Sequence, residues 1–186
     1  MLRAVRNGGM ILVAGLIALA ATNSVVYGQL DAGAKARGDY GYTGARHSVQ
    51  AAGTRIGHAR EYTRQVYDYS RNCPPGSIQA PVVKMESEQI GSTIQTARKN
   101  LDSVKSVANK AKDEDIVKRI ETIDKHLSAA AEHHKMLHME CCKDEVGNEA
   151  AGNCCNDLMV ELDKALAEHA ALLRQLKPAS PIKPEK

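Results

Sequence analysis

The sequence predicts an all-α protein, an antiparallel up-down-up-down four-helix bundle with a flexible N-terminal arm and a disordered C-terminal tail. Four segments place small or apolar residues at alternating steps of three and four, which is the spacing of one helix face. The chain of 186 residues contains no Phe and no Trp, so Leu, Ile, Val and Ala must fill the core. Helices of similar length joined by short loops pack as an antiparallel bundle. We therefore expect this bundle over residues 45–176.

Residues 1–28 have the features of a secretory signal peptide. Two arginines precede an apolar run over residues 10–21, which is shorter than a membrane span. Small residues permit cleavage after Gly28 or after Ala20, and an uncleaved leader would instead anchor the protein to a membrane. The sequence thus predicts a secreted or periplasmic protein, in a compartment where disulfides form.

A first helix is expected from residue 45 to residue 72, after a flexible arm over residues 29–44 that is rich in Gly and Ala. Pro74 and Pro75 end this helix, because proline disfavours helix in the residue before it and cannot donate to the helical ladder. Its predicted core face consists of Val49, Ala52, Ile56, Ala59, Thr63, Val66, Ser70 and Cys73.

A second helix is expected over residues 80–111 and a third from about 113 to 142. The apolar repeat advances by five residues between Ala111 and Ile116, which predicts a tight turn; one continuous helix is the alternative. The predicted core face of the second helix is Val83, Ser87, Ile90, Ile94, Ala97, Leu101, Val104, Ala108 and Ala111. That of the third is Ile116, Ile120, Ile123, Leu127, Ala130, His134, Leu137 and Cys141.

A fourth helix is expected after a loop that extends from Gly147 to Gly152. Pro178 ends it, and the Pro-rich and Lys-rich residues 177–186 are expected to be disordered. The predicted core face of this helix consists of Cys155, Leu158, Leu162, Ala165, His169, Leu172 and Leu176.

The antiparallel order brings all five cysteines to one end of the predicted bundle. Cys141 and Cys155 lie on facing core positions of the third and fourth helices, so we predict a disulfide between them. The first helix adjoins the fourth, which makes Cys73 and Cys154 the second predicted pair. Cys142 is then the free thiol.

His134, His138 and Cys142 are each four residues apart, so they form a row along one side of the third helix. Imidazole and thiolate are ligands for copper or zinc. Met85 or Met139 would add a thioether, which favours copper. The row is therefore the predicted metal site.

The same layer arrangement sets His126 level with His169, which makes them a second candidate pair for a shared metal ion. It also brings Tyr62 and Glu161 to the level of His134, where either would bond the second ring nitrogen of a metal-bound histidine. The structural alternative is that His134 is a core histidine whose ring nitrogens are satisfied by protein groups, while His133 and His138 are solvated.

The sequence contains no enzyme motif that we recognise, and we expect no catalysis. No Glu has His three residues later, as di-iron bundles require, and no Cys-x-x-Cys-His occurs for covalent haem. Nucleophile and zinc-protease motifs are absent as well. The balance of 25 Lys and Arg against 22 Asp and Glu predicts no nucleic-acid partner.

Two functions of different classes remain. The first is a secreted bundle that binds copper or zinc and acts as a metal buffer, sensor or resistance factor. The second is a disulfide-stapled structural module, whose partner is another protein or a second copy of the chain. Cysteine chemistry separates them, because metal binding requires at least one free thiolate near the histidines.

Overall fold

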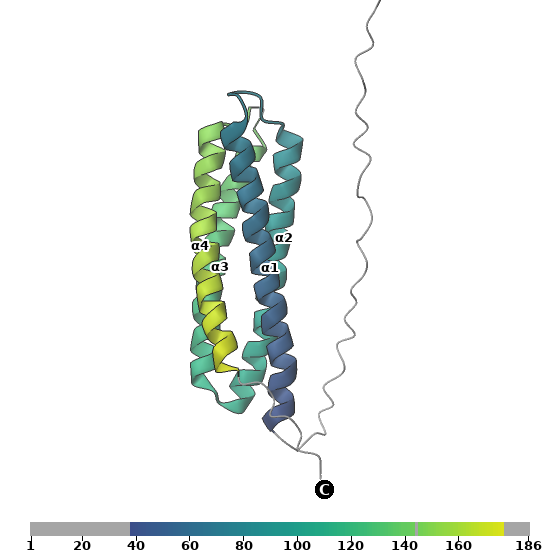
Figure 1. The fold of residues 1–186 in the computed structure, drawn as a ribbon, viewed down its shortest axis with the longest axis vertical. Helices are drawn as coiled ribbons and strands as arrows, with labels where there is room; N and C mark the ends of the chain where they lie inside the picture. The colour runs from purple at the N-terminus through teal and green to yellow at the C-terminus, as the bar shows by residue number, and fades with distance from the viewer. Residues whose placement is uncertain (1–37, 144, 177–186) are drawn as a thin grey trace, which may run out of the picture. The chain divides into compact units, whose positions relative to one another are not determined.

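The computed structural model describes residues 38–143 and 145–176, which form four α-helices. They are α1 (Gly38–Asn72), α2 (Ala80–Ala111), α3 (Glu114–Cys141) and α4 (Asn148–Gln175). Figure 1 shows the helices side by side and antiparallel, with α1 and α3 each packed against both α2 and α4. The up-down-up-down four-helix bundle is thereby confirmed. The predicted leader, the arm up to residue 37 and the tail lie outside the described residues.

The core is aliphatic, as the repeat of small and apolar residues predicted. Almost every residue of the four predicted core faces is buried. Cys73 and His134 are only half-buried, and Ala111 is exposed as the last residue of α2. Each described helix is apolar along one face only, and none of them has the length and apolar character needed to span a membrane.

Helix α1 begins at Gly38, so part of the expected flexible arm is helical. The prediction gave too much weight to Gly41 and Gly44, although a glycine costs a helix only about 1 kcal/mol relative to Ala. Once a helix is nucleated, each further residue adds a hydrogen bond. A helix that is packed from Ala45 onward therefore extends backwards through these glycines.

A tight turn separates α2 from α3, as the five-residue step predicted. Lys112 adopts the left-handed conformation, with φ of 57°, and its backbone N–H donates to the last turn of α2. The side chain of Asp113 then accepts a hydrogen bond of 3.2 Å from the backbone N of Ile116. This cap satisfies an otherwise unpaired donor in the first turn of α3.

Helix α4 begins at Asn148, so the expected loop as far as Gly152 is corrected to a shorter one. Gly152 lies inside the helix and is buried. A Cβ at this position would lie 3.6 Å from Oγ of Ser70, an ordinary van der Waals distance, so α4 packs against α1 here. The prediction interpreted this glycine as a helix breaker, and it therefore misplaced α4 along α3.

The loops α1–α2 and α3–α4 lie at the same end of the bundle, at the top of Figure 1. Asn148 joins them, because its Nδ2 donates hydrogen bonds of 2.8 Å to the backbone oxygens of both Ser70 and Cys73. We call this the cysteine end, since it contains Cys73, Cys141, Cys142, Cys154 and Cys155. The predicted convergence of the five cysteines on one end is confirmed.

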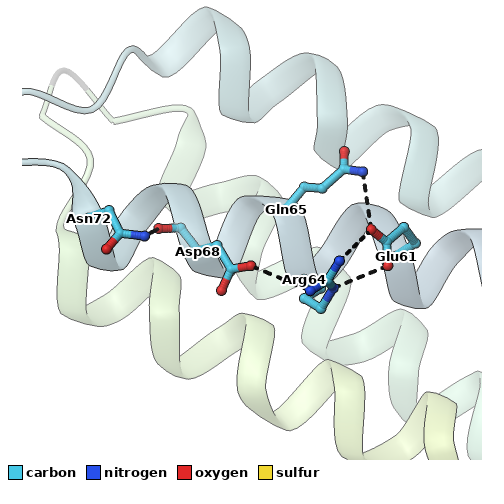
Figure 2. Close-up of polar contacts among 5 residues, drawn as sticks. All are labelled: Glu61, Arg64, Gln65, Asp68 and Asn72. Atoms are coloured by element: carbon cyan, nitrogen blue, oxygen red, sulfur yellow. Dashed lines mark hydrogen bonds and ion pairs between the residues drawn. The ribbon is translucent and has the colours of Figure 1, made fainter.

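Near the cysteine end, the exposed side of α1 carries a chain of polar contacts (Figure 2). Arg64 contacts Glu61 at 2.8 Å and Asp68 at 4.0 Å. Gln65 also donates to Glu61, at 3.5 Å, and Asn72 donates to the backbone oxygen of Asp68 at 2.8 Å. The hydrogen bond from Arg64 lowers the pKa of Glu61 below its usual value. These residues form a solvated helix face on which opposite charges pair.

Candidate metal site at the cysteine end

His134 is bonded to protein atoms, which limits its availability as a metal ligand. Its Nε2 donates to the backbone oxygen of Ser87 on α2, at 2.7 Å, and lies 3.2 Å from Oγ of the same serine. The ring occupies the space above Gly91, where an added Cβ would come within 2.6 Å of Cε1. Burial lowers the pKa of His134, so the neutral imidazole is favoured.

His169 makes the same kind of contact on the opposite side of the bundle. It is 8% exposed, and its Nε2 donates to the backbone oxygen of Val49 on α1 at 2.8 Å. The ring lies so close to Gly53 that an added Cβ would be 2.1 Å from Cε1. A backbone carbonyl of α1 therefore satisfies Nε2 of His169.

His126 and His169 take different partners, so the expected facing pair is not formed. Nδ1 of His126 contacts Oε2 of Glu161 at 2.7 Å, across the edge between α3 and α4. Because α4 starts earlier than predicted, Glu161 stands where His169 was expected. Glu161 also accepts from Lys164, so it bonds neither His134 nor a ligand of the predicted row.

The other two members of the predicted row lie together at the end of α3. Nε2 of His138 is 3.9 Å from Sγ of Cys142, and the ring centroids of His134 and His138 are 6.2 Å apart. Cys142 is exposed, whereas Nδ1 of His138 is buried and has no hydrogen-bond partner. The helical spacing thus brings an imidazole and a thiol into contact, and one ring nitrogen of the imidazole lacks a hydrogen bond.

The remaining cysteine-end thiols are less accessible. Cys141 and Cys155 are buried, and burial raises the pKa of Cys141 to about 11 and that of Cys155 to about 12. The neighbouring thiols Cys154 and Cys141 raise the pKa of Cys155 further. All five cysteines are free, so neither predicted disulfide is present, and both pairings stay predictions for the oxidised protein.

The methionines of the site are exposed. Met139 is 55% exposed beside His138 in the last turn of α3, and Met85 is 55% exposed near the start of α2. Within residues 38–143 and 145–176, no group of three or more His, Cys, Asp or Glu side chains is arranged to hold a metal ion. The described side chains therefore offer a two-residue contact to which further ligands must be added.

Sequence reasoning missed the two His–Gly contacts, those of His134 with Gly91 and of His169 with Gly53. A signal was present, because both glycines lie inside segments predicted as helix, where glycine has no local advantage. An interior helix glycine without a turn commonly has a packing reason. Pairing each with a histidine requires the alignment of two helices, which single-helix spacing does not supply.

Comparisons with known proteins yield no relative from which a function could be transferred. No protein-family model matches this chain, and neither a curated protein nor a solved structure matches it. The function has to be inferred from the side chains themselves.

Proposed function

We propose that this protein binds one soft metal ion, Cu(I) in the first place and Zn(II) as the alternative, through His138 and Cys142. The contact between Nε2 and Sγ, at 3.9 Å, is the observation that supports it. Zinc bonds to nitrogen and sulfur are about 2.0–2.1 Å and 2.3 Å long. With bonds of this length, atoms 3.9 Å apart subtend about 130° at a shared ion. That angle suits a three-coordinate or a distorted four-coordinate ion.

The surroundings of this pair also favour a cation. His138 lies in the last turn of α3 and Cys142 caps that helix. The unpaired carbonyls at a helix C-terminus carry partial negative charge, and a cation there is stabilised by about 0.3–1 kcal/mol. The thioether of Met139 is exposed in the same turn and is a soft ligand that suits Cu(I). Soft nitrogen and sulfur donors thus lie together at an accessible position where the electrostatic potential is negative.

His134 takes a supporting role in this proposal instead of the ligand role first expected. Its Nε2 is bonded to Ser87, and breaking that bond would leave a buried carbonyl with one partner fewer. The ring lies beside that of His138, with the two ring centroids 6.2 Å apart. Metal buffering, sensing or resistance are the roles that fit a bundle with a single exposed site.

Competition for Cu(I) with a coloured chelator, in reduced and oxygen-free solution, tests the proposal. The wild-type protein should take up one ion at the site, and H138A or C142S should weaken binding about tenfold or more. The matched control is H58A, because His58 is an exposed histidine on α1. Equal affinities in H138A, C142S and the control, or no binding tighter than micromolar, would contradict the site.

A second candidate function is the disulfide-stapled interaction module, and one observation favours it. Cys141 and Cys155 are both buried at the cysteine end, and burial raises the pKa of both thiols. Oxidation of this pair would remove two buried thiols and join α3 to α4 by a bond typically worth about 2–4 kcal/mol. Counting free thiols on protein from its native compartment tests the module, which predicts that the pairable cysteines are oxidised, whereas the metal site requires only that Cys142 stays reduced.

Export of the protein is part of the same proposal. Residues 1–28 carry the charge and hydropathy pattern of a secretory leader, and a metal buffer outside the cytoplasm would need such a leader. Mass spectrometry of the protein purified from its native host tests this. Mature N-termini at Gln29 or Ala21 agree with export, whereas a chain that retains Met1 in the cytoplasm does not.

A further inference from the structure

Two exposed methionines lie three residues apart on α3, close to the cysteine end. Met136 is 42% exposed and Met139 is 55% exposed, although both side chains are large and apolar. Met139 lies midway between the buried residues Leu137 and Cys141, so it is on the side of α3 that faces away from the core. Methionine is enriched in protein–protein interfaces, where its flexible side chain adapts to the partner. The pair therefore marks a candidate interface.

Opposite charges flank the methionine pair along the same side of the helix. Glu132 precedes Met136 by four residues, and Lys143 follows Met139 by four. Steps of four, three and four return to one side of a helix. Lys143 lies in the turn that follows α3, where its backbone N donates to the backbone oxygen of Glu140 at 3.2 Å. We call Glu132, Met136, Met139 and Lys143 the α3 stripe.

Both charges of the α3 stripe are free to meet a partner. Glu132 is exposed and makes no hydrogen bond or ion pair with any residue that the structure describes. The side chain of Lys143 is 60% exposed, and its Nζ contacts Oε2 of Glu140. A lysine ammonium group has three donors, so this contact leaves two for another acceptor. Glu140 thus holds Lys143 in place without using all its hydrogen-bonding capacity.

The α3 stripe is complementary to itself when it is reversed. If the α3 of a second copy lies antiparallel against it, Met136 of one copy faces Met139 of the other. Glu132 then faces Lys143 of the other copy, because facing residues of antiparallel helices have a constant sum of residue numbers, and both pairs have the same sum. A two-fold axis repeats each contact, as in an isologous dimer.

A similar pair of exposed apolar residues on α2 lacks this complementarity. Val82 and Met85 are also exposed and three residues apart. The positions four residues before and after them are Ile78 and Gln89, and neither residue is charged. A second copy set against that side of α2 would form no ion pair there. Charge complementarity therefore favours α3 as the side that meets a second copy.

We propose that the protein forms a homodimer through the α3 stripe, with the two α3 helices antiparallel. Two methionine contacts form its centre, and an ion pair between Glu132 and Lys143 of opposite copies lies at each end. The contact involves residues 132–143 only, so it is at the small end of protein interfaces, and we expect a dissociation constant in the micromolar range. The dimer does not rest on the metal site, because neither His138 nor Cys142 belongs to the stripe.

Charge reversal tests the dimer by analytical ultracentrifugation. The protein as produced in its native host is measured with a reductant and a metal chelator, so that neither a disulfide nor a metal ion joins two copies. E132K and K143E should each raise the dissociation constant about tenfold or more, because each places like charges together at both ends of the stripe. An equimolar mixture of E132K and K143E should dimerise like the wild type, since opposite charges then face each other at both ends.

Other variants separate the stripe from the rest of the surface. M136A should weaken the dimer, because it removes one side chain from each methionine contact. D102K is the matched control, since Asp102 is an exposed carboxylate on α2 outside the stripe, and it should leave the dimer unchanged. H138A and C142S should leave it unchanged as well, which separates the dimer from the metal site.

Circular dichroism verifies that each variant is folded. The dimer is overturned if the wild-type protein sediments as a monomer at millimolar concentration, or if E132K associates as strongly as the wild type. It is overturned equally if the mixture of E132K and K143E stays monomeric. Loss of association in the separate variants would then come from a cause other than the pairing of these two charges.

Discussion

His134 fills the space in which a side chain at Gly91 would begin, since an added Cβ would lie 2.6 Å from its Cε1 and 3.0 Å from its Nε2. The same ring donates to the backbone oxygen of Ser87, one helical turn before the glycine. His169 repeats the relationship over Gly53, with an even shorter distance of 2.1 Å. The two histidine rings thus occupy the space that side chains at Gly91 on α2 and Gly53 on α1 would take.

The substitution G91A should destabilise the protein by about 1–3 kcal/mol, because the new methyl group overlaps the His134 ring. In an H134A background the overlap is gone, and the same substitution should stabilise α2 by up to about 1 kcal/mol. G57A is the control, since an added Cβ at Gly57 meets nothing within 4 Å. Urea unfolding of the wild type, G91A, H134A and the double variant measures the coupling free energy between the two substitutions. Additive effects of G91A and H134A on the free energy of unfolding would contradict the contact.

The substitution G53A should cost more than G91A. His169 is buried deeper than His134, and its ring approaches Gly53 more closely, so it has less room to move aside. Displacing it would also break the bond to the oxygen of Val49, which would leave a buried carbonyl with one partner fewer. The expected loss is about 2–4 kcal/mol, near the upper range for overpacking. Thermal unfolding in which G53A and G91A shift the midpoint equally would argue against this order.

Mild acid should weaken the bundle through His134. Burial holds its folded-state pKa below the usual value of 6.5, so the unfolded chain binds the proton more tightly. The contribution of His134 is therefore fully present above about pH 6.5 and is lost as pH falls from there through the lower folded pKa. H134Q should flatten the dependence of unfolding free energy on pH in this window. A slope in H134Q equal to that of the wild type would contradict this role of His134.

Alkylation by iodoacetamide at neutral pH should modify Cys142 first. It is the exposed thiol of the described cysteines, whereas Cys141 and Cys155 are buried with pKa values raised to about 11 and 12. The thiolate is the reactive form, so both accessibility and ionisation protect the buried pair. Mass spectrometry of timed samples follows each cysteine. Modification of Cys155 in folded protein as fast as Cys142 would show that this end opens readily.

Much of the fold could be predicted from single-helix spacing. The alternation of three and four identified the buried residues from Val49 to Leu176, because a core face depends only on local sequence. Alignment between helices depends on where each one starts. The interpretation of Gly152 as a loop residue displaced α4, and for that reason His126 was matched with His169 instead of Glu161.

The candidate site was predictable to the same degree. The row on α3 follows from spacing within one helix, so the contact of His138 with Cys142 was within reach of the sequence. Whether a histidine is satisfied depends on the backbone of another helix. His134 donates to the backbone carbonyl of Ser87. Every residue carries an equivalent backbone carbonyl, so the residue type at position 87 does not reveal this bond.

Both glycines of the His–Gly contacts belong to the hairpin α1–α2, and both histidines belong to the hairpin α3–α4. Each half of the chain therefore carries one side of the contact only. Two copies of the first half would have the space beside their glycines unfilled. Two copies of the second half would have histidine rings with no glycine to pack against. The halves are complementary instead of alike, so the two contacts favour the pairing of one half with the other over the pairing of like halves.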